Sequence, residues 1–404
     1  MSKSLLLISF IAGLSLASCS NNSSSQHGKA IADSLRIRDS LALQDSIRLN
    51  SIVIPQDTLL EYTGKFLAGL SQKDENFFML LEDDNYWQKH KIMMDNNWAR
   101  MTRDRLQKMS DWELTHFAKQ INDTLPVFYP FSGPDFLHAH YVFPKTKTMV
   151  LAALEPIIEM PRIDTLSAKE RNHFLDTLAN SLRDIFNKSY FITTHMKKDF
   201  KKVKGVLPFF YVFMERSGFE LLDSRFIYID SIGTEKEVKA SQLHWHNTPG
   251  VKITFLHRAT RERKTLYYFS ISIANPGIVE RPGFVKFIQQ LGPVNTFVKS
   301  ASYLMHDPLF VEIKKLTMAQ SQSIFQDDTG IPYRDFKNDP GWTAQFYGEY
   351  EKPVKDFQHE QRYQTDLDSA YLKNKNKVEP LPFSLGYHWG SNKQNYMLLR
   401  KVNR

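Results

Sequence analysis

Between residues 57 and 204, apolar residues recur mainly with the spacing of amphipathic helices. Helical spacing is found over 59–67, 114–121 and 168–186. Residues 110–113 and 167–170 match the capping box that starts a helix, so two of these helices are predicted to begin there. Short apolar runs at 125–129 and 148–154 predict two strands. We therefore expect residues 55–204 to form a helix-rich half with a small sheet.

From residue 205 onward the pattern favours strands. Strand candidates rich in β-branched and aromatic residues lie at 226–229, 251–256, 266–273, 382–389 and 396–399. Helical spacing returns over 284–291, 297–305 and 310–324. These patterns predict a mixed α/β (α+β) fold. Its two halves, 55–204 and 205–404, can share one sheet.

Composition and charge narrow the class of protein. Of 404 residues, 42% are apolar and 24% are charged, which describes a folded chain and excludes a disordered one. The single cysteine excludes an internal disulfide and a cysteine-rich metal site. The net charge is +8, with basic runs at 197–204 and 258–264 that suit solvated faces or anionic head groups. No nucleic-acid-binding signature accompanies this charge, so no nucleic-acid partner is expected.

The first 19 residues have the layout of an export signal. Lys3 precedes an apolar run over 5–16 that is too short to span a bilayer as a helix. The run ends in Leu16-Ala17-Ser18-Cys19, which resembles the lipobox of bacterial lipoproteins. The resemblance implies that residues 1–18 are removed and that Cys19 becomes a diacylated N-terminus. An ordinary secretory signal with a chance cysteine is the alternative.

This resemblance also implies a location. A lipid anchor would hold the protein on a membrane without spanning it. Ser20 follows the cysteine, where an aspartate would suggest retention in the inner membrane, so an outer-membrane anchor facing the periplasm is expected. Residues 19–54, a polar stretch followed by a six-residue repeat, are predicted to be a tether and a stalk.

A first candidate for chemistry is the segment 128–135, Phe-Tyr-Pro-Phe-Ser-Gly-Pro-Asp, which predicts a tight turn between a strand and a helix. Glu155 ends the next strand candidate, 23 residues after Ser132. This spacing is similar to that of a Rossmann-type nucleotide site, where an acid after the second strand holds ribose hydroxyls. However, Gly133 stands alone where such sites have several glycines. An exported protein also has little access to S-adenosylmethionine or nicotinamide cofactors, so no cofactor is predicted.

Ser132 is also a candidate nucleophile. Its turn partly resembles the G-x-S-x-G elbow of hydrolases, with Pro130 and Pro134 where glycines are expected. A serine nucleophile needs a histidine base, and His388 near the C-terminus would supply the chain order of that fold. The alternative is that Ser132 only caps a helix or satisfies the turn.

The last 75 residues hold many aromatic side chains among polar ones, as in surfaces that bind glycans. Trp342, Tyr347, Tyr387 and Trp389 are the candidates for such a platform, with core packing as the alternative.

Two further groups of polar residues are candidates for cation or metal binding. Asp327 and Asp328 either bind a cation or satisfy the N–H groups of their own loop. Histidine pairs at 138/140 and 244/246 lack a third ligand in the sequence, so no metal site is predicted.

Three functional classes are compatible with these features. The first is a lipid-anchored envelope protein that binds a glycan, lipid or protein partner without catalysis. The second is an exported serine-type hydrolase acting on glycan, ester or peptide bonds. The third is a subunit that scaffolds a larger assembly.

Overall fold

The computed structural model describes residues 56–191, 203, 205–353, 357, 362–388 and 394–402. The signal, Cys19, the tether with its stalk, and Trp389 lie outside the described residues. Described residues from 56 onward belong to one compact unit.

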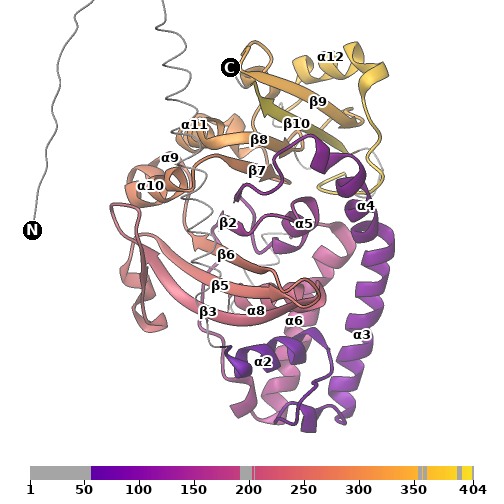
Figure 1. The fold of residues 1–404 in the computed structure, drawn as a ribbon, viewed down its shortest axis with the longest axis vertical. Coiled ribbons are helices and arrows are strands. Elements are labelled where there is room, and N and C mark those ends of the chain that lie inside the picture. The colour runs from indigo at the N-terminus through magenta and orange to yellow at the C-terminus, as the bar shows by residue number, and fades with distance from the viewer. Residues whose placement is uncertain are drawn as a thin grey trace, which may run out of the picture. The chain divides into compact units, whose positions relative to one another are not determined.

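A ten-stranded mixed sheet forms the centre of this unit (Figure 1). Its strands are β1 (Val127–Pro130), β2 (Thr148–Ala153), β3 (Phe219–Ile229), β4 (Glu235–Glu237), β5 (Pro249–His257), β6 (Arg263–Ser270), β7 (Val294–Val298), β8 (Ser321–Gln326), β9 (Trp342–Gly348) and β10 (Asn395–Lys401). They lie in the order β4-β3-β5-β6-β2-β1-β7-β8-β10-β9. The five strands from β6 to β8 are mutually parallel, and antiparallel strands extend the sheet on both sides.

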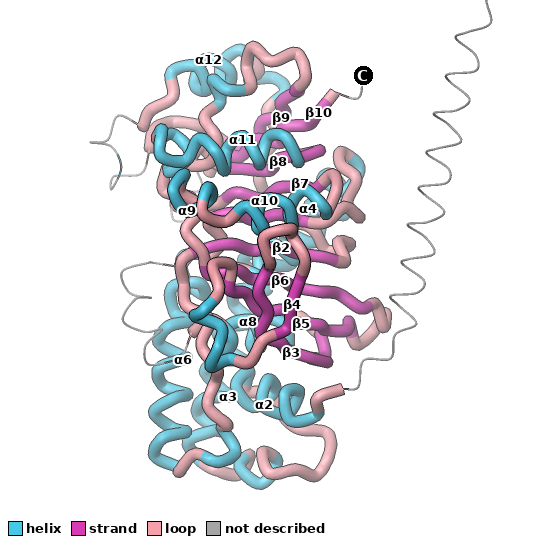
Figure 2. Tube along the Cα trace, turned by 90° about the vertical axis from the view of Figure 1, so that its left-hand side faces the viewer, coloured by secondary structure: helices cyan, strands magenta, loops and turns pink. Residues whose placement is uncertain are grey.

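Helices cover both faces of this sheet (Figure 2). One face packs against α2 (Thr58–Ala68), α3 (Asn85–Met101), α4 (Gln107–Thr115), α5 (Phe136–Val142), α6 (Ala168–Lys188) and α8 (Leu207–Arg216). The opposite face packs against α9 (Asn275–Val279), α10 (Pro282–Gln290), α11 (Val311–Gln320) and α12 (Thr365–Lys373). The sheet is therefore the middle layer of three.

Side-chain alternation along the central strands explains the two cores. Val127 and Tyr129 of β1 belong to the core under α2–α8, whereas Phe128 between them belongs to the core under α9–α12. Parallel strands covered on both faces are apolar throughout, and all four residues of β1 are buried. For this reason the apolar runs at 125–129 and 148–154 correctly predicted two strands.

The prediction of a mixed α/β fold is confirmed, and the description as two halves is not. Strands β1 and β2 come from the first half, yet they lie between β6 and β7 of the second. The small sheet expected for residues 55–204 is thus the centre of one large sheet.

Several local predictions were correct. The capping box of Ser167 and Glu170 is present at the start of α6. The segments 251–256, 266–273, 284–291 and 396–399 fall largely on β5, β6, α10 and β10.

Three local predictions were wrong. Residues 110–113 lie within α4, which continues from α3 through the π-helical turn Thr102–Leu106 and ends at Thr115. Residues 297–305 form the end of β7 and a turn instead of a helix. No strand is found at 382–388.

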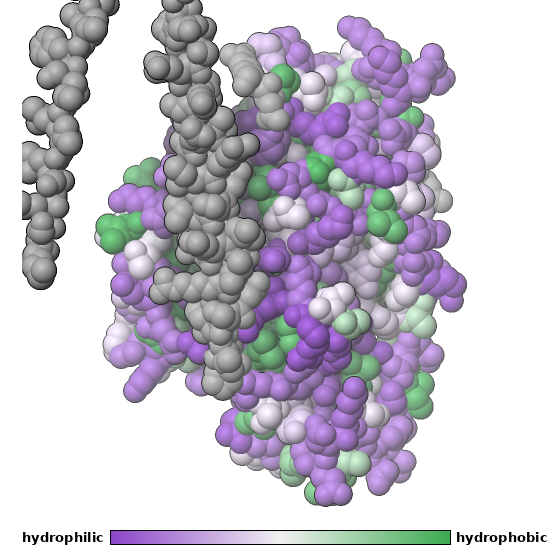
Figure 3. Space-filling model, in the orientation of Figure 1, coloured by the Kyte–Doolittle hydropathy of each residue, from purple (hydrophilic) through white to green (hydrophobic). Residues whose placement is uncertain are grey.

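On the face shown in Figure 3, hydrophilic side chains predominate and apolar ones are scattered. Across the described residues, we find no helix with the length and hydrophobicity needed to cross a bilayer.

Candidate functional site

The strand order creates a topological switch point at the carboxyl ends of the parallel strands. From β1 the chain moves through α5 to β2 on one side, whereas β7 on the other side leads through α11 to β8. The direction of winding therefore reverses between β1 and β7. In open α/β sheets, ligands bind outside the carboxyl ends of the strands at such a switch point.

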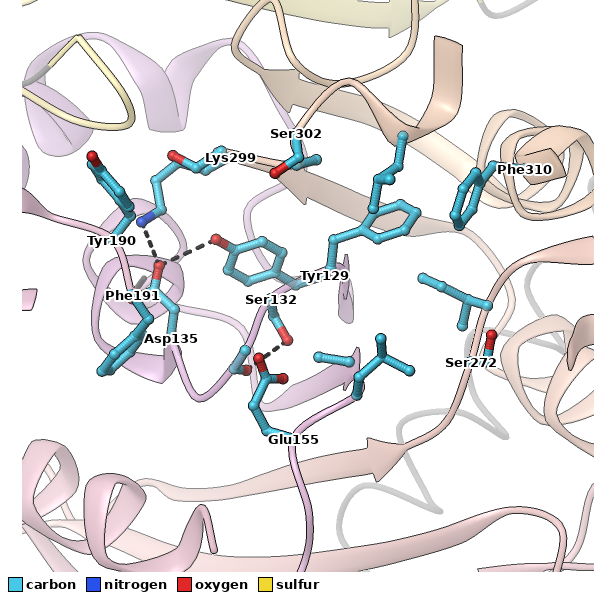
Figure 4. Close-up of a pocket in the computed structure, with 18 of the residues that line it drawn as sticks. Tyr129, Ser132, Asp135, Glu155, Tyr190, Phe191, Ser272, Lys299, Ser302 and Phe310 are labelled. Carbon is cyan, nitrogen blue, oxygen red and sulfur yellow. Dashed lines mark hydrogen bonds and ion pairs between the residues drawn. The ribbon is translucent and has the colours of Figure 1, made fainter. Parts of the chain in front are cut away.

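A cavity of about 290 Å³ lies at this position (Figure 4). It is lined by the residues that follow β1, β2, β6 and β7, together with Tyr190, Phe191 and Tyr387. In the view of Figure 4, Asp135 and Lys299 lie at one end, Phe310 and Ser272 at the other, and Glu155 between them. The cavity thus has a charged end and a largely apolar end.

Asp135 is the best-connected polar group of the cavity. It is the N-cap of α5, where its Oδ1 accepts from the backbone N–H of His138 at 3.2 Å and from the Nδ1–H of the same residue at 2.7 Å. Its Oδ2 accepts from the Tyr129 hydroxyl at 3.1 Å and lies 2.8 Å from the ammonium of Lys299. Lys299 also donates to the backbone carbonyl of Ser189. All four sites of this carboxylate are therefore occupied by protein groups.

Burial sets the charges of this cluster. Burial alone raises the pKa of Asp135, but His138 and Lys299 lower it to about 2. Burial lowers the pKa of His138 to about 4, so its imidazole is neutral at neutral pH. Lys299 is therefore the cation that compensates the buried carboxylate.

Glu155 supplies a second carboxylate, immediately after β2. A Cβ atom on Gly133 would lie 3.8 Å from its Oε1, so the turn after β1 and the acid after β2 meet at the cavity. Its Oε2 is 3.3 Å from the hydroxyl of Tyr268, which is nearer to the backbone carbonyl of Glu155 at 2.9 Å. Burial raises the pKa of this carboxyl group. The hydrogen bond from Tyr268 and the backbone N–H groups of Leu154 and Glu155 oppose this rise, so the protein also stabilises the charged form of Glu155.

The backbone around the cavity is strained. Among the described residues, three non-glycine residues with positive φ line the cavity: Phe131 at 60°, Ser300 at 53° and Ser302 at 53°. A left-handed conformation costs such residues about 1–2 kcal/mol each. Strained backbone of this kind concentrates at ligand sites and switch regions.

Ser132 lies in the cavity wall, and the structure supports its role in the turn. Its hydroxyl donates to the carbonyl of Gly133 at 2.8 Å, and Asp135, not Ser132, caps α5. Tyr387 lines the same cavity, whereas the next residue, His388, is not among the lining residues. Burial lowers the pKa of His388. Catalysis by Ser132 and His388 therefore stays a prediction.

The aromatic candidates occupy different surroundings. Tyr347 is fully buried in the core, where its hydroxyl accepts from Gln120 at 2.9 Å, so its ring has no face open to a glycan. Trp342 is partly exposed on β9, with Lys401 5.5 Å from its ring centre, and Tyr387 faces the cavity. The described members therefore do not form one platform, because the fold places them in the core, on the last strand of the sheet and at the cavity.

Asp327 and Asp328 satisfy groups of their own and neighbouring loops. Asp327 accepts from the N–H groups of Thr329 at 3.0 Å and Ser300 at 2.8 Å. Asp328 accepts from the Tyr303 hydroxyl at 2.5 Å and from the amide of Asn395 at 3.1 Å. This loop follows β8, whose first residues, 321–324, had been predicted as the end of a helix over 310–324. These carboxylates fix the strained loop that follows β7.

The sequence pattern did not predict the pair of Asp135 and Lys299, although Asp135 ends the candidate segment 128–135. Lys299 fell within the segment 297–305, whose apolar residues were assigned to a helix. Had residues 294–298 been identified as a buried strand, a lysine at its carboxyl end would have been a signal.

Comparison with known proteins gave no further guide: family models, curated proteins and solved structures all lack a match to this chain.

Proposed function

We propose that this chain is a lipid-anchored protein of the cell envelope that binds a small molecule in the cavity between β1 and β7. The anchor is the diacylated Cys19, and the folded unit faces the periplasm from the outer membrane. The observation that carries the binding proposal is the cavity itself, at the switch point of a doubly wound sheet and bordered by strained loops.

The chemistry of the charged end favours binding over catalysis. A general base works best with a pKa near the working pH. Asp135 has a pKa of about 2 and four protein contacts, so it has neither the basicity nor a free acceptor site. The pair of Asp135 and Lys299 instead forms a rigid end wall.

An exported serine-type hydrolase is the second candidate, favoured by the presence of the Ser132 hydroxyl in the cavity wall. It requires the imidazole of His388 to reach that hydroxyl. If a fluorophosphonate probe labels the wild type and neither Ser132→Ala nor His388→Ala, this alternative replaces the binding proposal.

The binding proposal is tested with the full lipoprotein, purified in mild detergent, by ligand-observed NMR. The probes are monosaccharides, muropeptides, amino acids, fatty acids and nucleosides. Ser272→Trp places a large side chain in the cavity wall, and Ser369→Trp on the exposed side of α12 is the matched control. We expect at least one probe to bind the wild type and the control but not Ser272→Trp. Binding that is equal in all three proteins, or absent from all probes, refutes the proposal.

The anchor is tested separately by membrane fractionation. Cys19→Ala should release the protein from membranes, whereas Ser20→Ala should leave it bound, because only the thiol can take the lipid. Membrane association of Cys19→Ala equal to that of the wild type would contradict the anchor.

A further inference from the structure

The charges of the cavity limit which ligands it accepts. Two carboxylates, Asp135 and Glu155, and one cation, Lys299, line it, so its formal charge is negative. Lys299 is already paired with Asp135 at 2.8 Å. The backbone N–H of His138 in the first turn of α5 is taken by Asp135 as well. A phosphate group would therefore find no uncompensated cation, and a neutral or positively charged ligand is favoured.

Glu155 defines the polar contact that a ligand must supply. A carboxylate has about four acceptor positions and no donor when ionised. Tyr268 provides one hydrogen bond of 3.3 Å to it, and the backbone N–H groups of Leu154 and of Glu155 itself also lower its pKa, so a ligand in the cavity would share the carboxylate with these protein donors. Two neighbouring hydroxyl groups on one ligand match the two oxygens of a carboxylate. The acid after the second strand of a doubly wound sheet holds ribose hydroxyls by this geometry.

The opposite end of the cavity suits a flat apolar group. Ile271 and Ile273, on either side of Ser272 in the chain, and Leu154, next to Glu155, contribute aliphatic side chains to the cavity wall. The rings of Phe131 and Phe310 meet edge to face with centroids 5.6 Å apart. A sugar alone would leave these walls uncovered, and an acyl chain would leave Glu155 without a donor. The volume of about 290 Å³ lies at the lower limit of small-molecule sites, which span about 300–1,000 Å³.

We propose that the cavity binds a ribonucleoside without phosphates, with its ribose hydroxyls on Glu155 and its base between Phe310 and the aliphatic walls after β2 and β6. This inference rests on the proposed small-molecule function and names the class of ligand for the same site. A ribonucleoside without phosphates differs from the phosphorylated cofactors of the cytosol, which the charge of the cavity disfavours.

The test uses isothermal titration of the full lipoprotein with adenosine, uridine, 2′-deoxyadenosine and ATP. The variant is Glu155→Gln, and Glu159→Gln, an exposed position four residues later, is the matched control. We expect a ribonucleoside to bind the wild type and Glu159→Gln equally. Loss of a hydrogen bond to a charged group corresponds to about 10-fold or more in affinity, so Glu155→Gln and the 2′-deoxy compound should each be weaker by about that factor. ATP should bind more weakly than adenosine.

The outcomes separate the two proposals. If adenosine and uridine do not bind but another probe binds in a manner blocked by Ser272→Trp, the nucleoside class is wrong and the cavity function stands. If a nucleoside binds but Glu155→Gln leaves its affinity unchanged, recognition of the ribose by Glu155 is refuted. Stronger binding of ATP than of adenosine also overturns the inference, because it requires a phosphate site. If no probe binds at all, both proposals fail.

Discussion

Replacing Lys299 by methionine tests the most buried charge pair of the cavity. Both side chains of the Lys299–Asp135 pair are 2% exposed, and their charged atoms lie 2.8 Å apart. Methionine keeps most of the length and packing of lysine but removes its charge. The carboxylate of Asp135 would then lie in the interior without the cation that is paired with it.

The expected loss in the free energy of unfolding depends on the hydrogen bonds that Asp135 retains. Removing one partner of a buried ion pair costs about 3–5 kcal/mol, because the other charge is left uncompensated. Asp135 would still accept hydrogen bonds from Tyr129 and from two N–H groups of His138. We therefore expect a loss near the lower end, about 3 kcal/mol, in the free energy of unfolding at pH 7.

The assay is urea unfolding followed by far-UV circular dichroism. Lys315→Met is the matched control, since its pair with Glu312 is exposed at 67% and 42% and should contribute less than about 1 kcal/mol. The double variant Lys299→Met/Asp135→Asn should recover part of the loss, because no unpaired charge remains. If Lys299→Met costs no more than Lys315→Met, the reasoning about compensation is wrong.

Two further predictions concern acid stability and the loop at Gly386, next to the cavity-lining Tyr387. Burial lowers the pKa of His140 to about 3, so the stability it supports is complete above its ordinary pKa of 6.5 and is lost as the pH falls from 6.5 toward 3. In urea unfolding at pH 4–7, His140→Phe should reduce the dependence of the free energy of unfolding on pH by up to about 1.4 kcal/mol per pH unit. The exposed His173→Gln should leave this pH dependence unchanged. Equal pH dependence in all three proteins would contradict the assignment to His140. Gly386 has φ of +79°, and a Cβ there would lie 2.9 Å from Oδ2 of Asp327, so Gly386→Ala should destabilise by more than about 1 kcal/mol. Gly292→Ala, with φ of +73° and open space around it, measures the backbone cost alone, and an equal loss in both variants would show that the contact with Asp327 is unimportant.

Local sequence patterns were sufficient for the class of fold and for several elements. The capping box of Ser167 acts within one turn, and the apolar runs at 125–129 and 148–154 match strands buried on both faces. Local patterns failed where the same pattern of apolar residues is compatible with both a strand and a helix. Residues 294–298, Val-Asn-Thr-Phe-Val, are all buried, but their two polar residues interrupt the apolar run, so the pattern does not distinguish a central strand from the start of a helix.

For the candidate site, the sequence identified some of the residues but not which of them lie together. The turn with Ser132 and Gly133 and the acid Glu155 were identified from spacing, because strand, turn and helix follow one another directly. The partnership of Asp135 with Lys299 joins residues 164 positions apart, and it exists only because β7 lies beside β1. Tyr387 reaches the same cavity from the C-terminal region. Burial then set the proton affinities of these groups, since desolvation depends on the packed interior and has no counterpart in the linear order of residues.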